Sequence, residues 1–186
     1  MHLLATSGAD LDDLEQAVDL AQSPAEIVLL SFSDSDLSAL AEAWTASSTE
    51  LPSLRLASLK RLKHPMSVDL YIDKVVLGAR AVVVRCLGGL DYWRYGVEQL
   101  GAACRKHDVP LAILPGDARD DTRLAEHATV EPPFAAELLA YFEAGGGAEN
   151  MRRLLGRIGG YLGAKDDNAD LAPIALSPLL ALGDGG

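Results

Sequence analysis

The chain has 186 residues, 49% of them hydrophobic, which is enough for one domain with a substantial core. Its 27 acidic residues against 16 lysines and arginines give a net charge of −11, which argues against general binding to nucleic acid or to an anionic membrane. No apolar run approaches the roughly 20 residues of a membrane-spanning helix, and the first residues lack the basic stretch of a secretory signal. We therefore expect a cytoplasmic protein with no nucleic-acid or membrane partner.

The charge is unevenly distributed. Residues 1–50 carry ten acidic side chains and no lysine or arginine, whereas residues 51–107 carry ten basic and four acidic ones. Residues 108–186 are acidic again, with six basic and thirteen acidic side chains. The two cysteines, Cys86 and Cys104, fit neither a disulfide framework nor a zinc site, so we expect them to be small core residues. The middle third is thus locally basic and is the place to look for an anion site.

Short apolar runs alternate with helical patterns from the start of the chain. The first predicted strand is Leu3–Thr6, and apolar residues at spacings of three and four predict a helix over Asp10–Ala21. Ile27–Phe32 is a continuous apolar run, typical of a strand buried on both faces. Ser33 or Asp34 is expected to cap the next helix, which extends to about position 47.

The same alternation continues to residue 118. The further predicted elements are a strand at Leu54–Leu59, a helix at Pro65–Leu77, a strand at Ala81–Val84, a helix at Tyr95–Lys106 and a strand at Pro110–Leu114. Five strands that alternate with helices predict an α/β fold with a parallel sheet and helices on both faces. We expect a flavodoxin-like strand order, 2-1-3-4-5.

The remaining third predicts a smaller extension. Helical patterns occur at about 121–128, 133–143 and 148–162, and from 165 onward the composition lacks periodicity. The predicted organisation is a flavodoxin-like domain over 1–118, a helical extension packed on it over 119–164, and a linker or disordered tail over 165–186.

Ligands of open parallel sheets usually bind beyond the carboxyl ends of the strands. Four predicted loops meet that condition, namely Thr6–Gly8, Leu59–His64, Arg85–Tyr95 and Pro115–Asp117. Two of these, Leu59–His64 and Arg85–Tyr95, belong to the basic third.

The first of the two brings Lys60, Arg61, Lys63 and His64 to the start of a predicted helix. Unpaired N–H groups at a helix start attract anions, so this cluster favours a group such as a carboxylate. Ser67 and Asp69 stand near the start of the helix and are included in the candidate site. The alternative is a solvated basic loop in which both residues only support the helix start.

The second loop, Arg85–Gly96, concentrates aromatic residues next to arginine. Tyr92, Trp93 and Tyr95 are three of the chain's ten aromatic residues and follow the permissive pair Gly88-Gly89. Aromatic faces beside guanidinium groups suit a large, flat, conjugated ligand with acidic substituents. The alternative is that Trp93 and Tyr95 pack under the next helix. Arg85, at the end of an all-valine strand, is expected to be partly buried with a partner.

Other site types are not predicted. The four histidines lack the spacing of metal ligands, and Gly88-Gly89 lacks the rest of a dinucleotide or P-loop fingerprint. No Ser-His-Asp or Cys-His arrangement is visible, so we name no catalytic residue and no metal site.

Several short segments together resemble one protein family. In combination and order they are similar to the N-terminal region of the large subunit of aerobic cobaltochelatase, the CobN type, which is related to the large subunit of magnesium chelatase. The resemblance runs from about Met1 to Gly163. The segments that carry it are His2–Thr6, Leu51–Leu56, His64–Tyr71, Val82–Gly89 with Tyr92-Trp93 and Tyr95-Gly96, Leu114–Asp117 and Glu149-Asn150.

The resemblance implies a function in cobalamin biosynthesis. Subunits of this family bind a tetrapyrrole, here hydrogenobyrinic acid a,c-diamide, and insert Co²⁺ together with two ATPase-type subunits. A corrin precursor is a broad macrocycle edged with carboxylates and amides, which suits cations beside aromatic rings. By this resemblance the substrate-binding residues are His64, Ser67, Asp69, Arg85, Gly88, Gly89, Tyr92, Trp93 and Tyr95.

Members of the family are several times longer than 186 residues, so the resemblance implies a first domain of a larger ligase. Its partners would be the remaining domains of the large subunit, the two ATPase-type subunits and the corrinoid substrate. We expect no cofactor in this chain, with Co²⁺ and ATP used by the complete complex. Metal insertion needs a base for the pyrrolic protons and a path for Co²⁺, neither of which the sequence shows. The isolated chain is therefore predicted to be inactive.

Two alternatives stay open. The basic, aromatic surface is equally suited to docking another chelatase domain or an ATPase subunit, with no ligand site of its own. The second alternative is a free-standing flavodoxin-like regulatory protein that binds a small anionic ligand. Flavin is not favoured, because no phosphate-binding loop rich in Gly, Ser or Thr follows the first predicted strand.

Overall fold

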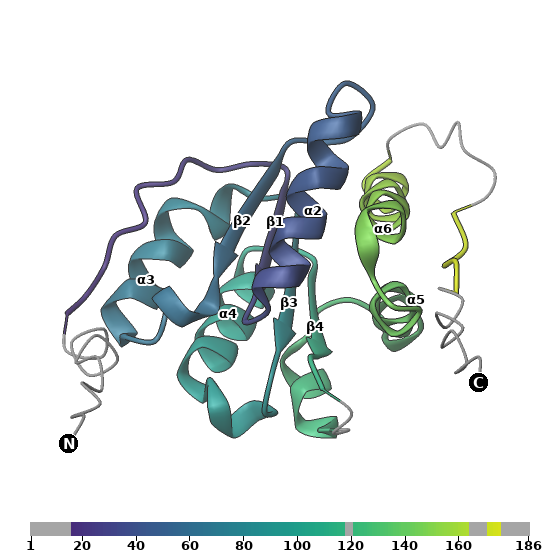
Figure 1. The fold of residues 1–186 in the computed structure, drawn as a ribbon. Coiled ribbons are helices and arrows are strands. Elements are labelled where there is room, and N and C mark those ends of the chain that lie inside the picture. Colours follow the sequence, from purple (N-terminus) through teal and green to yellow (C-terminus); the bar gives the residue numbers. More distant parts are fainter. Residues whose placement is uncertain (1–15, 118–120, 164–170, 176–186) are drawn as a thin grey trace, which may run out of the picture.

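Four parallel strands form the centre of the computed structural model (Figure 1). The structure describes residues 16–117, 121–163 and 171–175. The strand order is β2-β1-β3-β4, and every neighbouring pair is parallel. The strands are β1 (Ile27–Ser31), β2 (Leu54–Ser58), β3 (Ala81–Cys86) and β4 (Leu111–Pro115).

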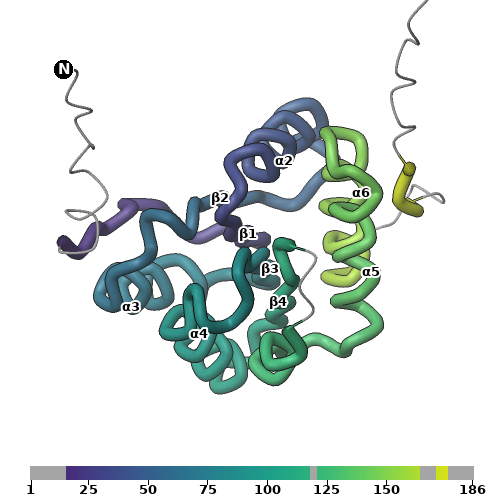
Figure 2. The backbone as a smooth tube through the Cα atoms, turned by 60° about the horizontal axis from the view of Figure 1, so that its bottom comes forward, coloured from purple at the N-terminus to yellow at the C-terminus, as the bar shows by residue number. Residues whose placement is uncertain are grey.

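Helices cover both faces of this sheet, as predicted. Figure 2 shows α3 and α4 on one side and α2, α5 and α6 on the other. The helices are α2 (Asp34–Ser47), α3 (Pro65–Lys74), α4 (Arg94–Lys106), α5 (Pro132–Glu143) and α6 (Gly147–Tyr161). Short 3₁₀ turns are η1 (Leu59–Arg61), η2 (Val76–Gly78), η3 (Leu90–Tyr92) and η4 (Thr122–His127).

Alternate residues of each strand belong to two separate hydrophobic cores, because successive side chains point to opposite faces of the sheet. Val28 and Leu30 of β1 belong to the core beneath α3 and α4. Ile27 and Leu29 belong to the core beneath α2, α5 and α6. All five residues of β1 are buried, as expected for an apolar strand covered on both faces.

The α/β fold is confirmed, but the sheet has four strands in the described residues rather than five. The strand predicted at Leu3–Thr6 lies outside the described residues. Counted from Ile27–Ser31, the described strands have the flavodoxin-like order 2-1-3-4. The prediction counts Leu3–Thr6 as the first strand and therefore places Ile27–Phe32 at the edge, which is wrong. In the structure β1 is central, with Ile27 opposite both Leu54 and Ala81. The physical reason is that the first four residues of β1 are apolar, whereas β2 carries Arg55, whose Nε donates to the Ser23 carbonyl at 2.8 Å and suits an edge strand.

The helix predicted over Asp10–Ala21 is also wrong where the structure describes it. Residues 16–25 form neither helix nor strand, and this N-terminal segment runs beside α3 (Figure 1). Tertiary hydrogen bonds replace helical ones, since the Val18 N–H donates to Ser67 Oγ at 2.8 Å. Gln22 links this segment to the Leu56 carbonyl and to the Tyr71 hydroxyl, at 3.0 and 2.9 Å. Long-range contacts thus override the local apolar spacing.

The other elements agree with prediction to within a few residues. The helix predicted to end at Leu77 stops at Lys74 and continues as the η2 turn, and the helix predicted at 121–128 is the 3₁₀ turn η4. The division into domains stays a prediction. Of residues 165–186 the structure describes 171–175, which contact α5 and α6. Among the described residues, no helix is both long enough and apolar enough to cross a membrane.

Candidate functional site

The loops after β2 and β3 meet at the carboxyl edge of the sheet, on the side of α3 and α4. Together with the residue that follows β1 they enclose an open cavity of about 420 Å³. Both sequence clusters therefore contribute to one surface, which we call the rim. The residues that line its cavity are Phe32, Lys63, Asp91, Tyr92, Trp93, Arg94 and Tyr95.

Tyr92 is the most exposed aromatic side chain of the rim, with 60% of its surface accessible. Its ring meets the buried Phe32 ring edge-on, with centroids 5.0 Å apart and planes at 76°. This T-shaped contact holds one part of the phenol and leaves the rest open. Tyr92 therefore has a ring surface available to a ligand.

Tyr95, at the start of α4, joins the two clusters directly. Its hydroxyl donates to Asp69 on α3, at 2.9 and 3.0 Å from the two carboxylate oxygens. The hydrogen bond to Asp69 raises the pKa of the Tyr95 phenol. The predicted pair Asp69 and Tyr95 is thus brought together, with Tyr95 38% exposed.

Trp93 supports the rim from below. The indole is 5% exposed, and its Nε1 donates to the Leu62 carbonyl at 2.8 Å. Gly96 makes room for it, since a Cβ at that position would lie 2.1 Å from the indole Cε2. Trp93 therefore packs beneath α4, offers no open stacking face, and ties the loop after β3 to the loop after β2.

In the basic loop Leu59–His64, one lysine is ion-paired and another is accessible. Lys60 is 2.7 Å from Asp34, whereas half-buried Lys63 lines the cavity and makes no ion pair within the described residues. His64 caps α3, with its Nδ1 accepting the Met66 N–H at 3.1 Å. Lys63 is therefore the cation that this loop offers to the rim.

Ser67 does not reach the cavity surface. It is 1% exposed, and its Oγ accepts the Val18 N–H. The hydroxyl thus fastens the N-terminal segment, residues 16–25, to α3.

Arg85 is partly buried with a partner, as expected, but it lies away from the cavity. Its Nη1 is 2.7 Å from Asp36, and its guanidinium sits 4.4 Å above the Phe142 ring on the α5 side of the sheet. Its Nη2 lies 3.4 Å from the Gly116 carbonyl. These contacts connect the ends of β3 and β4 with α2 and α5, so Arg85 organises the edge from inside.

Gly88 and Gly89 form a turn in which the N–H groups of Gly88 and Leu90 donate to carboxylates of the chain. Both have positive φ, +75° and +72°, which favours glycine. The Gly88 N–H donates to Asp117 at 3.1 Å and the Leu90 N–H to Asp121 at 2.8 Å. A Cβ on Gly89 would lie 2.6 Å from Asp121 Oδ2. The turn is therefore an anion-binding loop filled by the protein's own carboxylates.

Sequence reasoning missed the acidic partners of this edge. Asp36 pairs with Arg85, and Asp121 is held by Arg123 at 2.8 Å, a contact that lowers the pKa of the Asp121 carboxyl. Phe32 was also missed as a neighbour of Tyr92. Their positions could have indicated them, since Phe32 directly follows β1, Asp36 lies in the first turn of the next helix, and both stand at the carboxyl edge of the sheet.

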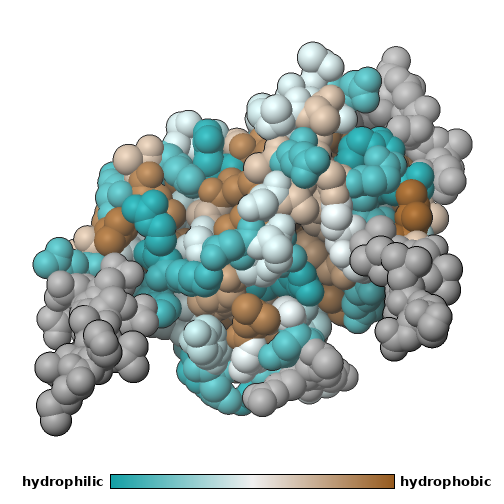
Figure 3. Space-filling view, in the orientation of Figure 1, coloured by the Kyte–Doolittle hydropathy of each residue, from teal (hydrophilic) through white to brown (hydrophobic). Residues whose placement is uncertain are grey.

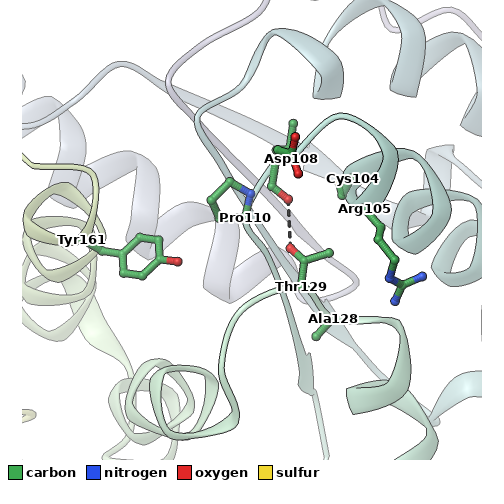
Figure 4. A pocket seen from close by; sticks show the side chains of 8 residues that line it. Cys104, Arg105, Asp108, Pro110, Ala128, Thr129 and Tyr161 are labelled. Carbon is green, nitrogen blue, oxygen red and sulfur yellow. Dashed lines mark hydrogen bonds between the residues drawn. The ribbon is translucent and has the colours of Figure 1, made fainter.

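A second open cavity, also of about 420 Å³, lies at the opposite end of β4 (Figure 4). Tyr161 points toward it from α6, and the Thr129 hydroxyl donates to the Val109 carbonyl at 2.9 Å. Among the described residues no group of three or more His, Cys, Asp or Glu side chains is placed to hold a metal ion. On the face shown in Figure 3, hydrophobic residues occur singly or in small groups among hydrophilic ones.

Comparison with known proteins identifies similar sequences. The chain is 44% identical over 146 residues to the aerobic cobaltochelatase subunit CobN of Sinorhizobium sp, and 40% identical over 146 residues to CobN of Pseudomonas aeruginosa strain PAO1. Each match covers 78% of this chain but only 11% or 12% of the relative. No protein-family model matches the chain.

Among solved structures, the catalytic subunit of cobaltochelatase from Mycobacterium tuberculosis has a similar fold, with a TM-score of 0.62. The match covers 82% of this chain and 11% of that one, at 24% sequence identity, and supports the fold alone. The sequence matches confirm the resemblance indicated by the short segments. Over most of its length this chain is similar to one part of the aerobic cobaltochelatase subunit CobN.

Proposed function

We propose that this chain is part of the large subunit of an aerobic cobaltochelatase and that its rim contributes to binding the corrin precursor. The observation that carries the proposal is the convergence of Lys63, Tyr92, Arg94 and Tyr95 around one open cavity at the carboxyl edge of the sheet. The proposed ligand is hydrogenobyrinic acid a,c-diamide, with Co²⁺ as the second substrate of the complete enzyme. ATP would be used by two ATPase-type partner subunits.

The chemistry of the rim matches an acidic macrocycle. Tyr92 and Tyr95 expose phenol rings to a flat conjugated system, and Lys63 stands beside them for a carboxylate. Arg94 is ion-paired with Asp91 and Glu98, so it would bind a ligand carboxylate only by exchanging one of these partners. A cavity of about 420 Å³ is smaller than a whole corrin, so the rim would form one wall and the remaining domains the rest. Trp93, Ser67 and Arg85 would support this wall without touching the ligand.

Titration with hydrogenobyrinic acid a,c-diamide, followed by the visible absorption of the ligand, tests the proposal. We expect saturable binding that weakens at least ~10-fold in Lys63→Ala and Tyr92→Ala, since each removes a charged or stacked contact. Tyr161→Ala, at the opposite cavity, is the matched control and should bind as the unmodified chain does. Absence of saturable binding, or equal loss in the control, would contradict the proposal.

Arg85→Ala is not a suitable probe, because it breaks a shielded ion pair and would disturb the whole edge. The docking alternative is separated by a pull-down with the remainder of the large subunit. If Tyr92→Ala weakens that association while the unmodified chain binds no corrinoid, the rim is a domain interface instead.

A further inference from the structure

Asn150 on α6 is buried, with 2% of its surface exposed, and both ends of its carboxamide contact the backbone of a single residue. Its Nδ2 donates to the Ile174 carbonyl, and its Oδ1 accepts the Ile174 N–H, each at 2.8 Å. An amide that pairs with both backbone groups of one residue imitates the edge of a β-strand. The Ile174 side chain is 41% exposed, so this contact recognises the main chain rather than the side chain.

Further contacts continue along the same segment. Arg153 Nη1 donates to the Ala172 carbonyl at 2.9 Å, and the Tyr141 hydroxyl of α5 donates to the Leu171 carbonyl at 2.5 Å. Gly156 leaves space for the Leu171 side chain, because a Cβ there would lie 3.3 Å from Leu171 Cδ2. One leucine side chain and three carbonyl groups are therefore recognised.

The spacing of these groups matches an extended peptide. Asn150, Arg153 and Gly156 are three residues apart on α6 and span about 9 Å along the helix axis. Three residues of extended chain, from Leu171 to Ile174, span about 10 Å. The segment runs antiparallel to α6, because Leu171 contacts Gly156 and Ile174 contacts Asn150. It lies beside α6 in the ribbon of Figure 1 and in the tube of Figure 2.

We propose that Tyr141, Asn150, Arg153 and Gly156 form a binding cleft for an extended peptide and that residues 171–175 of this chain occupy it. The cleft binds the peptide through hydrogen bonds to its backbone and through a contact with one leucine side chain. Release of the segment would break both hydrogen bonds between the Asn150 amide and Ile174, which favours the occupied cleft. A separate extended peptide whose leucine packs against Gly156 can bind only when the contacts of residues 171–175 with the cleft have been weakened. This site is separate from the rim.

Hydrogen exchange of the full chain tests the internal contact. The Ile174 amide should exchange at least ~10-fold more slowly than in an unstructured peptide, because Asn150 Oδ1 accepts its proton. Asn150→Ala should remove this protection. Ile174→Ala, the matched control, should keep it because the backbone is unchanged. Fast exchange in the unmodified chain, or protection that survives Asn150→Ala, overturns the proposal.

Binding of a separate peptide tests the cleft itself. A full chain with both Leu171→Ala and Ile174→Pro lacks the leucine and the N–H donor of the internal segment. On titration with the peptide Leu-Ala-Pro-Ile-Ala, the NMR signals of the Asn150 carboxamide should shift saturably. The same peptide with proline in place of isoleucine should bind ~10-fold more weakly, the loss of about one hydrogen bond. Unchanged signals, or equal binding of both peptides, overturns the proposal.

Discussion

Arg85 and Asp36 form a shielded ion pair, with Nη1 2.7 Å from Oδ2 and side chains only 18% and 13% exposed. The pair joins the end of β3 to the first turn of α2. Ser31 Oγ donates to the same Asp36 oxygen at 3.0 Å, so the end of β1 is included. This one carboxylate therefore connects the ends of the two central strands with the helix that follows the first of them.

Removal of one partner should be costly for stability. Arg85→Met leaves the Asp36 carboxylate shielded without its counter-charge, and we predict a loss of about 3 kcal/mol in the free energy of unfolding. The double variant Arg85→Met with Asp36→Leu should lose less than the sum of the single variants, because it buries no unpaired charge. Urea denaturation measures all three.

The exposed pair Lys60 and Asp34 supplies the control for this experiment. Their side chains are 51% and 74% exposed, so solvent screens the attraction. Asp34→Ala should change stability by no more than about 1 kcal/mol. A similar cost for the exposed and the shielded pair would contradict the role assigned to Arg85.

Gly96 allows the Trp93 indole to lie flat beneath α4. In Gly96→Ala the new methyl group would overlap the indole, so the ring must move. We predict a loss of about 2 kcal/mol, typical of overpacking, measured by urea denaturation. Ala102→Ser changes an exposed position of the same helix and should cost less than about 0.5 kcal/mol. Equal stability of Gly96→Ala and the unmodified chain would show that the packing is looser than described.

Both cysteines should be chemically inert in the folded chain. Cys86 and Cys104 are fully buried, and burial raises the pKa of each thiol to about 12. We predict that a disulfide reagent at pH 8 modifies them at least ~100-fold more slowly than in urea-unfolded chain. Ala102→Cys places a thiol at an exposed site and should react at once. Rapid modification of the native cysteines would show that the core opens.

Glu149 should remain ionised well into the acid range. Hydrogen bonds, first from Arg152 and then from Arg153, lower the pKa of its carboxyl from 4.5 to about 2. A pKa lower in the folded than in the unfolded chain means that the contribution to stability is present above pH 4.5 and is lost as the pH falls toward 2. An NMR titration of the carboxyl measures this value.

Arg152→Gln provides the comparison, because it removes the strongest of these hydrogen bonds. The pKa of Glu149 should rise toward the ordinary glutamate value in that variant. A pKa of about 4.5 in the unmodified chain would show that the ion pair does not persist in solution.

The fold was predictable where the local hydrophobic pattern and the tertiary contacts favour the same secondary structure. The continuous apolar run at Ile27 and the valine run at Val82 predict buried parallel strands, and both are found. The region of Val18 has helical spacing, yet its backbone N–H bonds to Ser67, 49 residues away. A contact at that separation leaves no periodic signal in the sequence, so the non-helical course of residues 16–25 could not be foreseen.

The candidate site was predictable as a region rather than residue by residue. The loops that contain Lys63 and Tyr92 do meet, because the carboxyl ends of parallel strands share one edge. Neighbouring members of one cluster differ in burial. Trp93 and Arg85 turn inward, whereas Tyr92 and Tyr95 stay exposed. Residue type alone does not indicate which aromatic ring faces solvent.

The bond from the Trp93 indole to the Leu62 carbonyl fastens two loops that are 31 residues apart in the chain. Because this anchor is already in place before any ligand arrives, the walls on both sides of the cavity are preorganised. Association at the rim would then require little ordering of the protein, and the costs that remain would include the dehydration of Lys63 and of the two phenols. Tight binding there would depend on how well the incoming molecule replaces that lost hydration.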